Sequence, residues 1–344
     1  MAFEATGEGN YLKDISQKIE RTLQRFFDEL RSHQNFIDFQ GSDFEAGVLR
    51  PAEDAVIASG GKRLRPILAH LSHDILGGKN KDIERIAVMP ELFHKGSVVI
   101  DDIEDSAPKD KNPLYRTYGK SAAINAGNFL YFMPQLILEN TSLQGAELAE
   151  VHAQLNHTAI TAHAGQALDI QWSGHPSFSD LPSEEKYISM IAAKTGSVFE
   201  LCATLGGIAA GAQPEKATGL REITKVTAIA YQLRDDILSL QEGVGDYGAD
   251  IAEGKVTLGL LYLSKNKPEL GKKLFQIQSK SVKSSDDIRE AISIMRDGGA
   301  IDYVERKIVE LAKQAKNKLH AEFPTSRYRD AFDTLIDACV VRSV

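Results

Sequence analysis

The sequence predicts an all-α protein, because apolar residues follow a helical period and strand-like alternation is almost absent. In the segment from Asp14 to His33 one helix face is apolar, formed by Ile15, Ile19, Leu23, Phe26, Phe27 and Leu30. The same spacing returns near the other end of the chain at Val304, Ile308, Leu311, Ala315 and Leu319. One large helical domain over residues 1–344, with residues 1–12 flexible, is the simplest interpretation.

Turn-forming segments separate the predicted helices. They lie at Gly77–Asn80, Gln144–Gly145, Ser173–Ser183, Glu242–Gly248 and Ser279–Ser285. In the third, Ser183 can cap a helix that has Glu184 and Glu185 in its first turn. None of these segments is long enough, or low enough in complexity, to be a domain linker.

Composition excludes several classes of protein. With 42% apolar and 26% charged residues, the chain has the composition of a globular protein and not of a disordered one. Its formal charge of −8 argues against a nucleic-acid partner but leaves room for a small basic pocket. Cys202 and Cys339 lie far apart, which suggests a reducing compartment. Without a visible secretory signal or a transmembrane segment, we expect a cytoplasmic protein.

Two acidic clusters interrupt apolar helical patterns. The first spans residues 101–105, Asp-Asp-Ile-Glu-Asp, and the second begins with Asp235-Asp236 at the end of an apolar run. Asp250 and Glu253 follow the second cluster. On a helix, the carboxylates of residues four positions apart share a face and repel one another. Hard divalent cations, which prefer oxygen ligands, would relieve that repulsion.

A solvated helix face is the ordinary explanation of an acidic pair. Asp286-Asp287 has a simple structural explanation, because it follows Ser285 at the start of an apolar pattern, where capping and the helix dipole favour carboxylates. The two clusters differ from this pair because they lie within apolar patterns.

Basic residues complete the pattern. Three cations follow a glycine pair in the segment Gly60-Gly-Lys-Arg-Leu-Arg-Pro66, which is not a phosphate-binding P-loop because no Ser or Thr follows Lys62. Lys194 lies in an apolar helical stretch, and Lys255 follows the second acidic cluster. Taken alone, each of these lysines is explained as an ordinary surface residue. Diphosphate groups would need both kinds of site, carboxylates bridged by metal and Arg or Lys donors.

The order of these motifs resembles that of the trans-isoprenyl diphosphate synthase family, and geranylgeranyl diphosphate synthases in particular, from about Val48 to Leu261. The matching motifs are GGKRLRP at 60–66, His94 seven residues before the first acidic motif, Gly165-Gln166 with Asp169, Lys194-Thr195, Tyr231-Gln232 before Asp235-Asp236, and Asp250 to Lys255.

The sequence departs from this family at two places. The family has two adjacent arginines and a glycine shortly after the first acidic motif, where this chain reads Ser-Ala-Pro-Lys-Asp-Lys-Asn-Pro over residues 106–113. Lys109 and Lys111, or Arg116, would have to substitute, although lysine lacks the bidentate fork of arginine. The second motif ends in Ser239, where many members have Asp.

The resemblance implies the isoprenoid synthase fold, a helical bundle around a central cavity, and head-to-tail prenyl transfer. It implies that about three Mg²⁺ ions hold an allylic diphosphate through the aspartates Asp101, Asp102, Asp105, Asp235, Asp236 and Asp250. It implies that isopentenyl diphosphate is held by Lys62, Arg65 and His94, with Gln166 also binding substrate. The catalytic set would be Lys194, Thr195, Gln232 and Lys255. A homodimer is also expected from the resemblance.

Product length is expected to depend on the helix before the first acidic motif. Gly96 and Ser97 are small and would leave a channel open, and Phe93, one turn deeper, would close it. That arrangement favours a C20 or C25 product, although Phe93 is equally well explained as an ordinary core residue.

Two other functions remain open from the sequence. A class I terpene cyclase shares the first acidic motif, but it would have an Asn/Asp-Ser-Glu second metal motif and would not need the GGKRLRP segment. A non-catalytic regulatory subunit of a prenyl synthase would account for the missing arginine pair.

Overall fold

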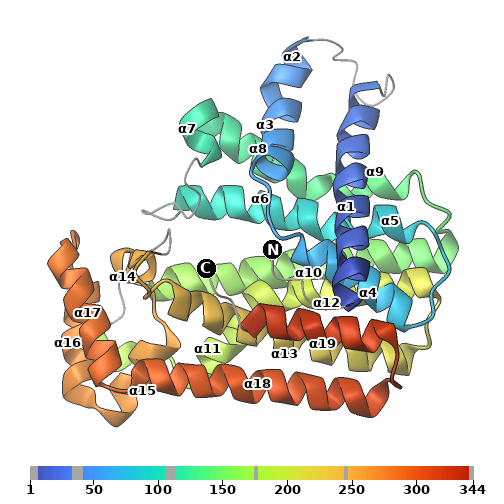
Figure 1. Cartoon of the computed structure of the whole chain (residues 1–344). Helices are drawn as coiled ribbons and strands as arrows, with labels where there is room; N and C mark the ends of the chain where they lie inside the picture. Colours follow the sequence, from blue (N-terminus) through green and yellow to red (C-terminus); the bar gives the residue numbers. More distant parts are fainter. Residues whose placement is uncertain (1–6, 33–41, 105–112, 174–176, 244–246, 341–344) are drawn as a thin grey trace. The chain divides into compact units, whose positions relative to one another are not determined.

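The computed structural model of the chain describes residues 7–32, 42–104, 113–173, 177–243 and 247–340. Within these ranges every regular element is helical (Figure 1), which confirms the predicted all-α class. The chain divides into two compact units. Unit 1 comprises Met1–Ala159, Val198–Arg221 and Glu322–Thr334, and unit 2 comprises Ile160–Ser197, Glu222–Ala321 and Leu335–Val344. The single-domain interpretation stays a prediction.

Unit 1 is built mainly from the first half of the chain. The elements that lie wholly within it are α1 (Gly7–Ser32), α2 (Ser42–Phe44), η1 (Glu45–Leu49), α3 (Arg50–Glu53), η2 (Asp54–Ala58), α4 (Leu64–Ile75), α5 (Ile83–Ile86), α6 (Met89–Glu104), α7 (Leu114–Tyr118), α8 (Lys120–Phe132) and α9 (Pro134–Leu138).

Unit 2 contains most of the later elements. Those wholly within it are η3 (Phe178–Asp180), α11 (Glu184–Ile191), η4 (Ala192–Gly196), α14 (Ala249–Glu253), α15 (Leu258–Asn266), α16 (Pro268–Gln278) and α17 (Ser285–Asp297). The division between the units falls inside α10 (Gly145–Trp172), α12 (Ser197–Ala210), α13 (Pro214–Leu238), α18 (Ala300–Glu322) and α19 (Arg327–Val340).

The predicted apolar stripes are buried. Along α1 the side chains of Ile15, Ile19, Leu23 and Phe27 are at most 2% exposed, so this helix packs its stripe into unit 1. Residues 7–12, expected to be flexible, lie in α1, and Leu12 is fully buried.

Two serines cap helices. Ser183 accepts a hydrogen bond from the Lys186 backbone N–H at 3.3 Å and caps α11 as predicted. The structure corrects the second cap by one residue, because Ser284, and not Ser285, is the N-cap of α17. Ser284 and Asp287 form a capping box in which each side chain bonds the other's backbone N–H. Asp286-Asp287 therefore has a structural role, as the sequence indicated.

One stretch of the described residues, Glu184–Ala210, is long and apolar enough to cross a membrane by length and composition. Of its most apolar window, 67% is buried inside the protein. This is weak evidence for a membrane span, because a mostly buried core helix passes the same test.

Candidate active site

A glycine loop, residues 59–63 in unit 1, joins η2 to α4. Gly60 and Gly61 have φ angles of 61° and 130°, which glycine adopts without steric penalty. Arg63 has a φ of 50° and is the one non-glycine residue with positive φ among those described. A left-handed conformation costs a residue with a Cβ roughly 1–2 kcal/mol, so contacts elsewhere must hold Arg63 in place.

The two arginines near this loop have different environments. Arg63 is buried and pairs with two carboxylates, Glu20 and Glu91. Burial acts to lower the pKa of Arg63, but the two carboxylates outweigh it and hold the pKa above its usual value. Arg65 is 9% exposed and its guanidinium lies 5.4 Å from the centre of the Phe199 ring.

Arg65 is suited to bind an anion. In the described part of the chain its Nε has no hydrogen-bond partner. A buried guanidinium with an unused donor carries a desolvation cost that an incoming oxyanion would offset. Lys62, in the adjacent loop, is exposed. Of these two cations, only Arg65 is buried.

Helix α6 carries the first acidic motif at its carboxyl end. Asp102 is 4% exposed and Asp101 is partly buried. Phe93 and His94 lie two turns earlier, Phe93 buried and His94 partly buried. The ring of Phe93 lies 5.0 Å from that of Tyr131 on α8. Three predicted site residues, Asp105, Lys109 and Lys111, lie outside the described residues.

Tyr131 interacts both with Phe93 and with the carboxylates of the first acidic motif. Burial raises the pKa of its hydroxyl, and the negative charges of Glu104 and Asp101 raise it further. Tyr131 is therefore close enough to Asp101 to feel its charge and also contacts Phe93.

The structure corrects the role expected of Gly96. A Cβ at this position would lie 2.7 Å from the backbone oxygen of Gly127, so Gly96 lies against α8 and does not open a channel. A Cβ on Gly127 would in turn lie 2.9 Å from Ile100. The paired glycines allow α6 and α8 to pack side by side (Figure 1).

The second acidic motif lies in unit 2, at the end of α13. Tyr187 of α11 donates a hydrogen bond to Oδ2 of Asp236 at 2.6 Å, and Gln232 donates to its Oδ1 at 3.2 Å. Burial raises the pKa of Asp236 to about 7, and the negative charges of Asp250 and then Asp235 contribute in the same direction. Without a cation, this carboxyl is therefore partly protonated near neutral pH.

Ser239 has a defined role at the position where many family members have Asp. Its hydroxyl is 2.9 Å from Oδ2 of Asp250 and donates to it. Asp236, Ser239 and Asp250 line one small pocket together with apolar side chains such as Leu258. A serine here orients Asp250 without adding a further negative charge.

The predicted Lys194-Thr195 motif lies on η4, a π-helical turn of the kind often found at functional sites. Lys194 pairs with Asp169 of α10 at 2.6 Å, and Thr195 donates to Oε1 of Gln232 at 3.0 Å. Thr195, Gln232, Asp236 and Tyr187 thus form one hydrogen-bonded chain.

The Gly165-Gln166 motif brings α10 against η4. A Cβ at Gly165 would lie 2.4 Å from the backbone nitrogen of Lys194, so only glycine permits this approach. Gln166 is partly buried next to it. Lys255 is 9% exposed and pairs with Glu253 at 2.5 Å.

Sequence reasoning missed two contacts within this site. Tyr187 was not assigned a role, although its place on the buried face of α11 and its aromatic hydroxyl are visible signals. Asp169 belongs to the motif of Gly165-Gln166, but its ion pair with Lys194 joins two helices and has no signal in the sequence.

The carboxylates fit the kind of magnesium site in which substrate phosphates and water supply the remaining ligands. In the described ranges no group of three or more His, Cys, Asp or Glu side chains is arranged to hold a metal ion alone. Mg²⁺ is usually held by one or two carboxylates together with substrate phosphates and water. The raised pKa of Asp236 fits this arrangement, since a cation would replace the proton. Asp101 and Asp102 lie in unit 1, and Asp235, Asp236 and Asp250 in unit 2.

The all-helical fold and the order of the motifs are those of the isoprenyl diphosphate synthases, which are prenyltransferases. The family model described as polyprenyl synthetase matches residues 47–295, and the chain therefore belongs to that family.

Relatives and solved structures of this family are similar to the chain over most of its length. The geranylgeranyl diphosphate synthase of Methanosarcina mazei is 27% identical over 308 residues, covering 86% of this chain and 92% of its own. The geranylfarnesyl diphosphate synthase of Aeropyrum pernix is 30% identical over 304 residues, covering 83% and 92%. The structure of the geranylgeranyl pyrophosphate synthetase of Geoglobus acetivorans has a TM-score of 0.81 at 25% identity, covering 96% of this chain and 99% of that one.

Proposed function

We propose that this prenyltransferase condenses isopentenyl diphosphate with an allylic diphosphate, head to tail, and that it depends on Mg²⁺, with about three ions in each active site. The observation that carries the metal dependence is the pair of Asp236 and Asp250: burial raises the pKa of Asp236 to about 7, and the negative charge of Asp250 contributes in the same direction. A divalent cation would stabilise both carboxylates in their charged form.

The metal ions would be held by the aspartates of both acidic motifs. Asp105, which lies outside the described residues, would belong to this set. When bound, Mg²⁺ would neutralise the leaving diphosphate and favour cleavage of the allylic C–O bond. Tyr187 and Gln232 would hold Asp236 in the orientation that meets the metal, because both donate to its oxygens.

The cationic residues would divide between the two substrates. Lys62, Arg65 and His94 would bind isopentenyl diphosphate, and Gln166 would support substrate binding. Lys194 and Lys255 would assist the charge of the allylic diphosphate, each oriented by a carboxylate, Asp169 or Glu253. Lys109 and Lys111 would take the place of the family's arginine pair. Lysine can supply the charge there but not a bidentate contact.

Thr195 and Gln232 would stabilise the allylic cation. The hydroxyl of Thr195 donates a hydrogen bond to Gln232, so the lone pairs of its oxygen can face positive charge. Exclusion of water from the site would then protect the cation until the double bond of isopentenyl diphosphate attacks it. The new C–C bond leaves a carbocation on the isopentenyl unit, which would lose a proton to the released diphosphate.

We also propose a C20 or C25 product. Asp101, Ser97 and Phe93 recur every four residues on α6 and so lie along one face of the helix. A growing chain that starts at Asp101 would pass the small Ser97 and stop at Phe93, which is backed by Tyr131. The names of the M. mazei and A. pernix relatives, a geranylgeranyl and a geranylfarnesyl diphosphate synthase, agree with these two lengths.

Two further parts of the proposal concern assembly and location. We propose a homodimer, for which exposed apolar side chains on α8 offer a surface, Ile124 at 41% and Phe132 at 71% exposure. We propose a cytoplasmic location. Light scattering of the purified protein should give twice the chain mass of 37.7 kDa.

The test is the reaction itself. Purified protein is incubated with Mg²⁺, isopentenyl diphosphate and a C5, C10, C15 or C20 allylic primer, and dephosphorylated products are identified by mass spectrometry. Products longer by C5 steps, ending at C20 or C25 and absent when EDTA is added, are expected. A cyclic hydrocarbon from one primer alone, or no turnover of any primer, would overturn the proposal.

A further inference from the structure

Arg63 lies between Lys62 and Arg65 in the sequence, but its guanidinium turns into the protein. Its side chain is 1% exposed. Nε donates to Glu20 at 2.7 Å, Nη1 donates to Glu91 at 2.9 Å, and Nη2 donates to the backbone oxygen of Val56 at 2.8 Å. The donors of Arg63 are thus used within the protein, on three different elements.

We propose that Arg63 is a positioning residue for the isopentenyl diphosphate site, with Glu20 of α1 and Glu91 of α6 as its two anchors. This inference rests on the proposed function, because it takes Lys62 and Arg65 as the cations that bind isopentenyl diphosphate. Glu20 and Glu91 would then strengthen the binding of isopentenyl diphosphate without touching it.

The backbone around Arg63 explains how it would act. Arg63 is in the left-handed conformation immediately before α4 begins at Leu64. Lys62 is the residue before it and Arg65 the second residue after it. Any rotation of the Arg63 backbone toward a more ordinary conformation would therefore displace both cations.

Helix α6 holds the glycine loop at a second point. Lys95 donates to the hydroxyl of Ser59 at 2.7 Å and to the backbone oxygen of Gly60 at 2.8 Å. Glu91 and Lys95 are four residues apart, so they lie on the same face of α6. The helix that ends in the first acidic motif therefore also fixes the start and the end of the glycine loop.

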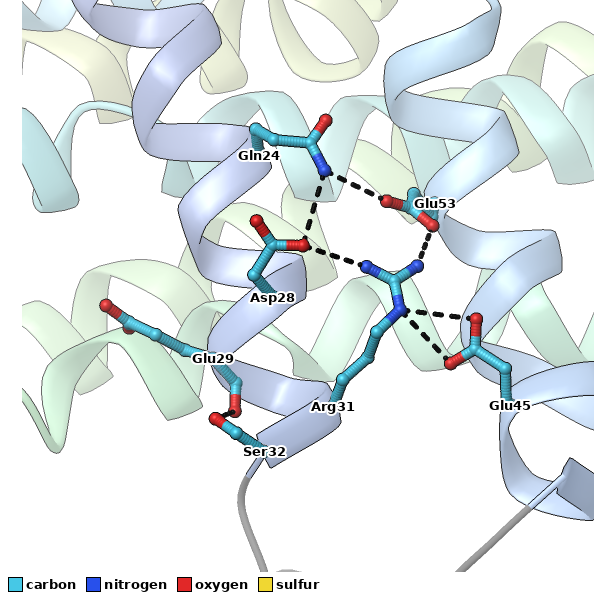
Figure 2. Close-up of polar contacts among 7 residues, drawn as sticks. All are labelled: Gln24, Asp28, Glu29, Arg31, Ser32, Glu45 and Glu53. Atoms are coloured by element: carbon cyan, nitrogen blue, oxygen red, sulfur yellow. Dashed lines mark hydrogen bonds and ion pairs between the residues drawn. The ribbon is translucent and has the colours of Figure 1, made fainter.

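Helix α1 supplies the other anchor and is itself firmly held. Arg31 bonds Glu45 of η1 and Glu53 of α3, and Gln24 also bonds Glu53 (Figure 2). These contacts tie α1 to the elements that lead into the loop. Helix α1 lies outside the matched residues 47–295, so the family match alone gives it no part in substrate binding.

The chain offers a closely matched control in Glu29, which is on the same helix. Glu29 accepts two hydrogen bonds from Arg85 of α5, at 2.8 and 2.7 Å, and its side chain is 35% exposed. Glu20 accepts two from Arg63, at 2.7 and 3.3 Å, and its side chain is 47% exposed. Each pair joins α1 to another part of unit 1, but only that of Glu20 reaches the glycine loop.

The experiment compares Glu20→Gln with Glu29→Gln in the full-length protein. In Glu20→Gln the KM for isopentenyl diphosphate should rise about tenfold, the scale of one weakened charge-assisted contact. The KM for the allylic primer and kcat should stay within about twofold. Calorimetry with isopentenyl diphosphate alone should show the same loss of affinity. Glu29→Gln should leave all of these unchanged.

Arg63 is tested directly by Arg63→Lys and Arg63→Gln. Lysine keeps the charge but cannot reach both carboxylates and the Val56 oxygen at once, so it should restore part of the affinity that glutamine loses. If neither variant folds, Glu20→Gln still decides the question, because its site is half exposed.

Two results would overturn the inference. One is an unchanged KM for isopentenyl diphosphate in Glu20→Gln while its melting temperature falls as in Glu29→Gln. The other is an equal rise of both substrates' KM values. If the unaltered protein condenses no substrates at all, the proposed function fails instead, and calorimetry with isopentenyl diphosphate still tests the inference.

Discussion

Replacing Gly165 with alanine should damage both the stability and the catalytic rate of the enzyme. The new Cβ would lie 2.4 Å from the Lys194 nitrogen and 2.8 Å from its Cα, where ordinary contacts are 3.4–4 Å. Both neighbours are backbone atoms of η4, so α10 and η4 must separate by roughly 1 Å. Overpacking of this kind costs about 1–3 kcal/mol.

The separation would also move Lys194 and Thr195 away from their partners. Because a misplacement of about 1 Å can cost roughly 100-fold in rate, kcat should fall by one to two orders of magnitude. Urea unfolding measures the first effect, and initial rates at saturating substrate measure the second.

Gly47→Ala is the matched control for this change. Gly47 is helical, and a Cβ there meets nothing within 4 Å. This variant should keep its activity and gain up to about 1 kcal/mol in the free energy of unfolding. If Gly165→Ala were as stable and as active as the unaltered protein, the explanation of the Gly165-Gln166 motif as a close helix contact would be refuted.

Three further predictions concern product length and pH. Phe93→Ala should lengthen the product by at least one C5 unit in mass spectrometry, and an unchanged distribution would leave Phe93 an ordinary core residue. Because the pKa of Asp236 is raised from 3.8 to about 7, the metal-free native state binds more protons than the unfolded state between these values. The free energy of unfolding, measured with urea in EDTA, should therefore fall as the pH rises from about 4 to about 7. Saturating Mg²⁺ should reduce that fall. A free energy of unfolding that does not fall in EDTA would contradict the raised pKa of Asp236. Tyr187→Phe removes a hydrogen bond that lowers the pKa of Asp236, so the acidic limb of the pH–rate profile should move to higher pH; an unmoved limb would show that Asp236 does not control it.

The fold class was predictable because it depends on local periodicity. The stripe that begins at Ile15 is buried along α1, and Ser183 caps α11 as its position before two glutamates indicated. The cap of α17 was misplaced by one residue, since Ser284 and Ser285 are equivalent in the sequence and only the backbone geometry separates them.

Contacts between distant residues were not predictable in the same way. Arg63 and Arg65 are both cations in one motif, but it is Arg63 that pairs with Glu20, a residue 43 positions earlier in the chain. Gly96 looked like space for a substrate, whereas it is the point where α6 meets Gly127 of α8. In both cases the sequence identifies a special position, and the partner that determines its role comes from another helix.

The most direct test of the central claim is anomalous diffraction from crystals grown with Mn²⁺, in place of Mg²⁺, and an unreactive allylic diphosphate analogue. We expect metal ions that join the diphosphate to side chains of both acidic motifs, Asp101 with Asp102 and Asp235 with Asp236. Metal bound at one motif only, with the other too distant to share the diphosphate, would contradict the mechanism.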